Sequence, residues 1–228
     1  MYLKFMQKRN HIFREGKNIM KILFATTNPA KIKRYSEKLQ KRDIEVMTIK
    51  DLGIHLDIEE TGKNAIENAF IKAKAYYDAS KITTIGIDDN LVIEGIPEEK
   101  QPGTHVRRIN GKELTDDEMI EYYTNLVREY GGKLTAKWVY GVVVYNGKEA
   151  KQNSWSKSHF YFVDKPSGKR NPGYPLDSIS IMPEVNKYFV DLTDEDRSKN
   201  KQNYNDDDII DFIANALEDR NKADVEKN

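Results

Sequence analysis

Apolar residues in the first half of the chain alternate between short runs and helical spacing. The run at residues 22–24 predicts a buried strand, and Ile32, Tyr35 and Leu39 follow at the spacing of one buried helix face. Further strands are predicted over residues 44–49 and 82–87, and a helix is predicted between them. That helix has an apolar face of Ile66, Ala69, Phe70, Ala73 and Tyr77. This half therefore predicts strands that alternate with helices.

The second half predicts more antiparallel structure. A helix over residues 115–130 opens with a capping pattern at Thr115 and Glu118. Two β-rich runs, at 135–145 and 152–163, are separated by a short polar link that favours a hairpin. A last helix follows residue 205, with a face of Ile209, Phe212, Ile213 and Ala216. Together these elements predict an α/β fold with a mixed sheet.

The two ends of the chain differ from the region between them. Residues 1–19 are basic and lack the apolar core of a signal peptide, so we expect a disordered extension, with Met20 as an alternative start. Residues 20–218 show no repeat and no linker and are expected to form one domain, followed by a polar tail over 219–228. No run approaches the roughly 18 apolar residues of a membrane span, so no membrane partner is expected.

Composition excludes several classes of function. Lys+Arg and Asp+Glu both number 37, so no overall basic field favours nucleic acid. The absence of cysteine excludes disulfides and thiolate catalysis, and it suits a reducing cytoplasm. The four histidines lack metal-ligand spacing, so any metal is expected to be a hard cation held by carboxylates.

The segment after the first predicted strand has the chemistry of an anion site. Asn28 suits a helix N-cap and Pro29 suits the first helical position, so residues 25–31 form a short loop that enters a helix. A helix N-terminus attracts anions, and Lys31 adds a positive charge on the first turn. The loop predicts a phosphate site without the Walker glycines, although an ordinary capped helix would have the same pattern.

Acidic residues complete a set that phosphoryl chemistry requires. Asp88 and Asp89 follow the predicted strand at 82–87, and ligands of open α/β sheets bind at the carboxyl ends of strands. Glu59 and Glu60 precede the helix that carries Lys72. Carboxylates for Mg²⁺, cations for phosphates and a base for water are thus all present. Taken singly, each of these residues is equally explained as a solvated surface group.

Taken together, the motifs resemble the inosine/xanthosine triphosphate pyrophosphatase (Ham1-like) family. Its T-x-N-x-x-K motif matches residues 26–31, and its E-x-T-G-x-x-x-x-E-N-A-x-x-K-A block matches residues 59–73. The D-D-S-G-L motif is represented by residues 88–91 without its glycine, and P-G-x-x-S-A-R by residues 102–108. The resemblance covers about residues 20–217.

This resemblance implies an elongated central mixed sheet flanked by helices, with two lobes around a nucleotide cleft, usually in a homodimer. Such enzymes hydrolyse nucleoside triphosphates to a monophosphate and pyrophosphate. By position, the resemblance implies that Asp89 orients or deprotonates the attacking water and holds Mg²⁺ together with Glu59. It also implies that the triphosphate is bound by four residues: Thr26, Asn28, Lys31 and Lys72.

The parts of the family pattern that read the base are altered. The F-G-[YW]-D-P motif is reduced to residues 172–175, in which Tyr174 can still face a base. Arg197 stands at the lysine of the E-K-N motif, and Lys201, Gln202 and Asn203 replace its Ser-His-Arg run. The sequence thus predicts a Mg²⁺-dependent pyrophosphatase that removes non-standard purine triphosphates. The alternative is a catalytically weakened nucleotide-binding module of the same fold.

Overall fold

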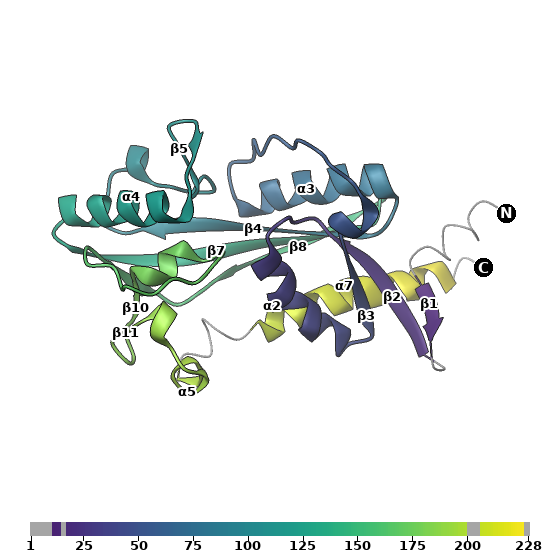
Figure 1. Cartoon of the computed structure of the whole chain (residues 1–228). Helices are drawn as coiled ribbons and strands as arrows, with labels where there is room; N and C mark the ends of the chain where they lie inside the picture. The colour runs from purple at the N-terminus through teal and green to yellow at the C-terminus, as the bar shows by residue number, and fades with distance from the viewer. Residues whose placement is uncertain (1–10, 15–16, 200–205, 226–228) are drawn as a thin grey trace. The chain divides into compact units, whose positions relative to one another are not determined.

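The computed structural model describes residues 11–14, 17–199 and 206–225, which form two compact units (Figure 1). The first unit comprises the described residues of Met1–Asp88, Gly141–Ser154 and Asp206–Asn228. The second comprises those of Asp89–Tyr140 and Trp155–Asn205. Strands β4 (Thr84–Ile93) and β7 (Lys133–Tyr145) run through both units.

Apart from β8, the other strands and helices each belong to one unit. Those of the first unit are β1 (His11–Arg14), β2 (Lys17–Phe24), α2 (Pro29–Gln40), β3 (Ile44–Thr48), the 3₁₀ helix η1 (Lys50–Leu52), α3 (Ala65–Ser80), β8 (Ala150–Ser156, of which the last two residues belong to the second unit) and α7 (Asp207–Val225). Those of the second are η2 (Glu98–Lys100), β5 (Arg108–Ile109), β6 (Lys112–Glu113), α4 (Asp116–Glu129), β9 (Phe160–Val163), η3 (Pro175–Ser178), β10 (Ser180–Met182), β11 (Lys187–Tyr188), η4 (Phe189–Asp191) and α5 (Asp194–Ser198).

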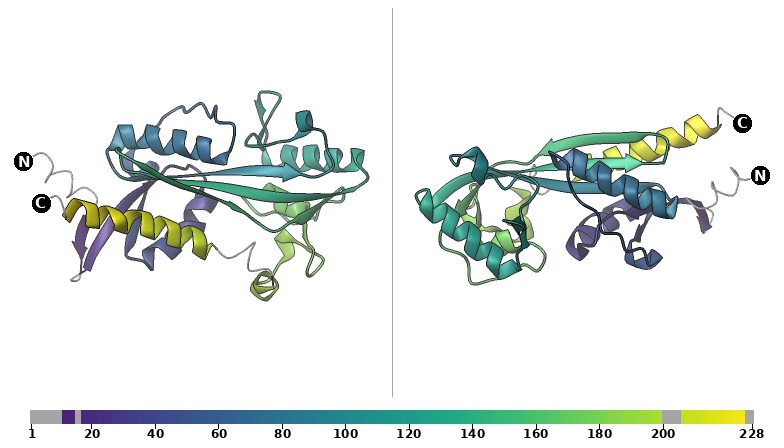
Figure 2. Two further views of the ribbon diagram at one scale, coloured as in Figure 1. Left: turned by 180° about the vertical axis from the view of Figure 1, so that it is seen from behind. Right: turned by 90° about the horizontal axis from the view of Figure 1, so that it is seen from above.

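All described strands except β5 and β6, which pair with each other, form a large mixed sheet flanked by helices, as the sequence predicts (Figure 2). Hydrogen bonds join them in the order β1-β2-β4-β7-β9-β10-β11, with β3 paired to β2 and β8 paired to β7. Strands β3 and β4 pair with β2 in parallel, whereas β9 pairs with β7 antiparallel. Parallel pairs need crossover helices, and α2 and α3 supply them here.

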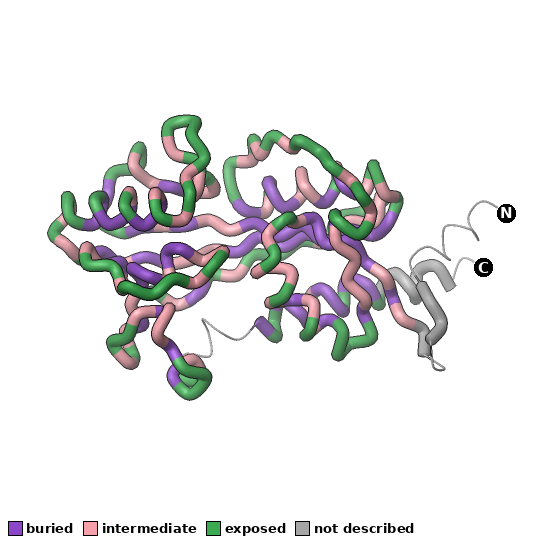
Figure 3. Tube along the Cα trace, in the orientation of Figure 1, coloured by how far each residue is buried: buried purple, intermediate pink, exposed green. Residues whose placement is uncertain are grey.

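In the first unit, α3 lies unusually close to the sheet because small residues face each other. A Cβ added to Gly86 would lie 2.0 Å from the carbonyl oxygen of Ala69, and one added to Gly141 would lie 2.4 Å from the backbone of Ala65. Neither strand position tolerates a side chain, so glycine lets the helix backbone approach the sheet. This close packing buries the inward face of α3 and fixes its position on the strands (Figure 3).

The start of α7 is held by an ion pair. Asp206 lies next to the helix and accepts hydrogen bonds from Arg34 Nε at 2.9 Å and Arg34 Nη2 at 2.8 Å. The buried Asp206 thus ties α2 to α7.

The second unit has a separate core on one side of α4. The capping box predicted for this helix is present, since Thr115 Oγ1 accepts from Glu118 N and Glu118 Oε2 accepts from Thr115 N. Tyr123 is fully buried, and its hydroxyl donates to the Val106 carbonyl at 2.9 Å. This contact fixes the loop before α4 on the core.

Two predicted strand boundaries differ from the structure. Strand β4 continues to Ile93, so Asp88 and Asp89 lie within the strand rather than after it. The polar residues interrupt the apolar pattern, but Leu91 and Ile93 extend the strand because they are buried in the second core. The predicted run at 152–163 divides into β8 and β9. Met20 lies within β2, opposite His11 of β1.

None of the helices in the described ranges combines the length and the apolar character that a bilayer crossing requires.

Candidate active site

The loop between β2 and α2 forms the predicted helix cap. Asn28 Oδ1 accepts hydrogen bonds from Ala30 N at 2.9 Å and Lys31 N at 3.4 Å, and Asn28 N donates to Thr26 Oγ1 at 3.1 Å. Two N–H groups that the sequence left available to an anion are therefore satisfied by the cap. What the loop offers a phosphate is the positive end of the helix dipole and the charge of Lys31.

A buried ion pair joins α3 to β4. Lys72 Nζ donates to Asp88 Oδ1 at 2.7 Å and lies 3.4 Å from Glu60 Oε1. The side chains of Lys72 and Asp88 are 13% and 9% exposed. Charged groups are almost never buried to this degree unless they are paired. Lys72 is therefore not the solvated helix lysine that the simplest interpretation of the sequence suggests.

Charges from three segments meet at Asp88. Burial raises the pKa of the Asp88 carboxyl above its ordinary value, and Glu60 adds to that rise, whereas Lys72 and Lys31 oppose it. Lys31 therefore acts on the same carboxylate as Lys72, although the two lysines lie on different helices. The first unit thus gathers two cations and two carboxylates into one polar cluster: Lys31, Lys72, Glu60 and Asp88.

Two members of this cluster, Glu60 and Asp88, are acids to which the sequence gave no individual role. Glu60, not Glu59, contacts Lys72, and Glu59 is exposed with its carbonyl accepting from Thr61 N at 3.1 Å. Asp89 is the next residue after Asp88 along β4, and successive side chains of a strand point to opposite faces. The α3 face of β4 is thus occupied by Asp88. Strand parity is the signal that could have identified it, since Gly86 also faces α3.

The cluster has the donor types of a hard-cation site. No group of three or more His, Cys, Asp or Glu side chains that could hold a metal is found in the described parts of the chain. Magnesium sites in phosphoryl-transfer enzymes, however, use only one or two carboxylates together with phosphate oxygens. Asp88 Oδ2 is buried without a hydrogen-bond partner among the described residues, so a carboxylate oxygen remains available. The residues present therefore fit a divalent cation that arrives with a phosphorylated substrate.

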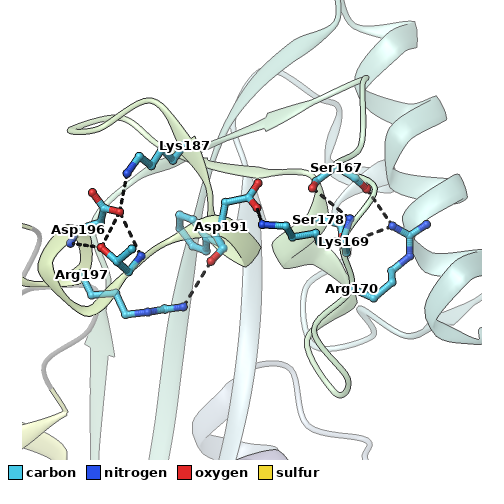
Figure 4. Close-up of polar contacts among 10 residues, drawn as sticks. Ser167, Lys169, Arg170, Ser178, Lys187, Asp191, Asp196 and Arg197 are labelled. Carbon is cyan, nitrogen blue, oxygen red and sulfur yellow. Dashed lines mark hydrogen bonds and ion pairs between the residues drawn. The ribbon is translucent and has the colours of Figure 1, made fainter.

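The predicted base-reading residues lie in the second unit on short elements. Tyr174 precedes η3, and its N–H donates to the Asn171 carbonyl at 2.9 Å. Arg197 lies on α5, and its Nη2 is 3.4 Å from the Phe189 carbonyl that it faces (Figure 4). Lys201, Gln202 and Asn203 lie outside the described residues.

Ion pairs surround these elements. Lys187 Nζ donates to Asp196 Oδ2 at 2.8 Å, and this bond, with those from Thr193, lowers the pKa of Asp196 to about 2 (Figure 4). Lys169 pairs with Asp191 at 2.6 Å. Asp196 on α5 and Asp191 on η4 are thus each paired with a lysine.

These features define an α/β protein with an Asn-capped strand–loop–helix unit and a buried Lys–Asp pair that joins α3 to β4. Comparison with known proteins places it further: the model of the Ham1 family matches residues 22–205, and the chain belongs to this family. A dITP/XTP pyrophosphatase of Aquifex aeolicus is 31% identical over 79% of this chain and 89% of its own length. One from Bacillus subtilis is 30% identical over 78% and 88%.

Solved structures agree with this assignment. The Staphylococcus aureus Ham1 protein matches with a TM-score of 0.66 and 25% identity, covering 88% of this chain and 99% of that one. A Ham1 protein from Coxiella burnetii shares the fold with a TM-score of 0.70, at 22% identity over 88% and 100%. The family resemblance and the mixed α/β fold predicted from the sequence are confirmed.

Proposed function

We propose that this protein is a Mg²⁺-dependent nucleoside triphosphate pyrophosphatase that releases a nucleoside monophosphate and pyrophosphate. The observation that carries the proposal is the polar cluster of the first unit, in which Lys31 and Lys72 act on the buried carboxylate of Asp88. Such a cluster suits a highly charged phosphate ligand. The proposal is supported by relatives named dITP/XTP pyrophosphatase that match most of the chain.

Each residue of the site has a distinct part in this proposal. Lys31 and Lys72 neutralise the phosphates, while Thr26 and Asn28 shape the loop that receives them. Glu59 and Asp89 would hold Mg²⁺, with Asp88 Oδ2 as the further carboxylate oxygen available to it, and the bound ion would neutralise phosphate charge and favour the departure of pyrophosphate. Asp89 orients the attacking water and accepts its proton as the new P–O bond forms. The bond that breaks is the anhydride between the α- and β-phosphates.

The substrate class is deaminated, non-standard purine triphosphates, so the protein would remove damaged nucleotides from the pool. Tyr174 and Arg197 are the residues that would face the base. We further propose a homodimer, as the family resemblance implies, acting in the cytoplasm, which suits a chain without cysteine. Neither nucleic acid nor a membrane is a partner in this proposal.

A second candidate is a nucleotide-binding module with weakened catalysis. The observation that favours it is that Lys72 already pairs with both Asp88 and Glu60, so a phosphate must compete with these carboxylates. The altered residues at 201–203 favour it too.

One experiment separates these functions. The full-length protein is incubated with Mg²⁺ and a panel of standard and deaminated nucleoside triphosphates, and pyrophosphate is resolved from phosphate. We expect pyrophosphate and monophosphate in equal amounts. Release of phosphate alone would indicate a different hydrolase. Nucleotide binding without either product would support the binding module.

A further inference from the structure

Asn68 is a buried polar residue of α3 to which the proposed chemistry gives no role. It is fully buried, and its Oδ1 accepts a hydrogen bond from Gly62 N at 2.7 Å. Its Nδ2 group has no hydrogen-bond partner among the described residues. An unpaired buried donor lowers stability, so packing alone gives no reason for an asparagine at this position.

Gly62 lies close to both the side chain and the backbone of Asn68. A Cβ added to Gly62 would lie 2.5 Å from Asn68 Oδ1 and 2.7 Å from Asn68 N, which is nearer than real Cβ atoms approach. The N–H of residue 62 can reach Asn68 only because this residue lacks a side chain. We call this pair of residues the Gly62–Asn68 clasp.

The clasp holds the segment that carries the two acids. Thr61 N donates to the Glu59 carbonyl at 3.1 Å, so the backbone turns tightly just before Gly62. Glu60 then reaches Lys72, which lies four residues after Asn68 and therefore on the same face of α3. The acidic segment is thus anchored at two points on one helix face.

The clasp is not needed to start the helix. Asn64 is the N-cap of α3, with Oδ1 accepting from Glu67 N at 3.0 Å. Glu67 Oε2 in turn accepts from Lys63 N at 2.8 Å. The first turn is already capped by these bonds, so the hydrogen bond of Asn68 serves the loop rather than the helix.

We infer that Asn68 is a positioning residue that acts through Gly62 to fix Glu60 beside Lys72, and with it the backbone that carries the neighbouring Glu59. It thereby sets the affinity of the site for a divalent cation bound with a nucleotide. This inference rests on the proposed function. Residues that orient metal ligands typically change metal affinity by about 10- to 100-fold when they are replaced.

The test uses Mn²⁺ as the probe. Free Mn²⁺ is measured by electron paramagnetic resonance with the full-length protein and an α,β-methylene analogue of inosine triphosphate, and melting temperatures are recorded in parallel. We expect Asn68→Leu to raise the Kd for Mn²⁺ about tenfold or more. Its melting temperature should change little. The substitution removes the hydrogen bond that Asn68 Oδ1 accepts from Gly62 N, but it also removes the unpaired Nδ2 group, and the two effects offset each other.

Asn64→Ala is the matched control, because it also removes an asparagine acceptor from the start of α3. We expect it to lower the melting temperature and leave the Kd for Mn²⁺ unchanged. Gly62→Ala breaks the clasp from the loop side and leaves every residue of α3 unchanged, so it tests the inference even if Asn68→Leu does not fold. Its effect on the Kd should not add to that of Asn68→Leu, since both variants remove one contact.

The possible results are distinguishable. An unchanged Kd in Gly62→Ala or in folded Asn68→Leu, with a wild-type protein that binds Mn²⁺, would overturn the role of Asn68 alone. Equal losses of affinity in Asn64→Ala and Asn68→Leu would also overturn it, because helix stability would then explain both. Absence of Mn²⁺ binding by the wild-type protein would overturn the proposed function and this inference with it.

Discussion

The two units of the molecule hold their candidate site residues in different ways. In the first, Lys72 and Asp88 lie on a 16-residue helix and a 10-residue strand, and both side chains are largely buried. In the second, Tyr174 and Arg197 lie beside η3 and on α5, elements of four and five residues. Rigid elements with buried charges suit a fixed phosphate chemistry. Short elements have few backbone hydrogen bonds of their own to fix a side chain, and it is beside these elements that the base-reading motifs of the family are altered.

The largest effect is expected at Asp89. Asp89→Asn keeps the shape of the side chain but removes the proton acceptor, so kcat should fall by roughly 10²–10⁴, as for other positioned bases. Stability should change little, because Asp89 is only partly buried. Rates of pyrophosphate release are compared with those of Asp88→Asn. A larger loss in Asp88→Asn, with normal turnover in Asp89→Asn, would exchange the roles of the two carboxylates.

The next effect concerns the buried ion pair of the first unit. Lys72→Met leaves Asp88 buried without its main partner, so the free energy of unfolding should fall by about 3 kcal/mol. Affinity for the triphosphate should fall far more than affinity for the nucleoside. Denaturant unfolding and calorimetric titration measure these two quantities.

Lys74→Met is the matched control on the same helix. Lys74 pairs with Asp78, but both side chains are about half exposed, and such pairs contribute at most about 1 kcal/mol. The double variant Lys72→Met/Asp88→Asn should recover most of the lost stability. If Lys72→Met and Lys74→Met were equally stable, the Lys72–Asp88 pair would contribute no more to the free energy of unfolding than a solvent-exposed pair.

Local signals in the sequence explain which parts of this comparison could be predicted. The cap by Asn28 and the capping box of α4 depend on residues within one or two turns, and both are present. The predicted face of α3 is only partly right, because Ala69 and Ala73 are buried whereas Ile66, Phe70 and Tyr77 are half-buried. The Lys72–Asp88 and Arg34–Asp206 pairs join residues that are distant along the chain, so no local pattern contains them. The continuation of β4 through Asp88 and Asp89 depends on burial in two different cores.

A smaller effect is expected in the second unit. Arg197→Ala removes one charged donor at the edge of the predicted base site, so kcat/KM for inosine triphosphate should fall about tenfold. Arg170→Ala is the control, because it removes another arginine of this unit, one that pairs with Asp117. It should leave kcat/KM for inosine triphosphate unchanged. The wild-type protein should prefer inosine over guanosine and adenosine triphosphates by less than about 10³, because the Ser-His-Arg run is replaced. A higher ratio would show that other residues read the base.

The smallest effect is expected in the pH dependence of stability, which can be compared for one carboxylate of each unit, Asp196 and Asp88. The pKa of Asp196 is lowered to about 2 from 3.8, so its interactions stabilise the fold above about pH 4, and this stability is lost as the pH falls toward 2. Burial raises the pKa of Asp88, so ionisation of this group lowers stability as the pH rises above 3.8. The difference in melting temperature between Asp196→Asn and wild type should therefore become more negative as the pH rises from 2 to 4. For Asp88→Asn the difference should move in the positive direction as the pH rises above 4. Slopes of the same sign would show that Lys72 and Lys31 outweigh the burial of Asp88, and that the two units do not differ in this respect.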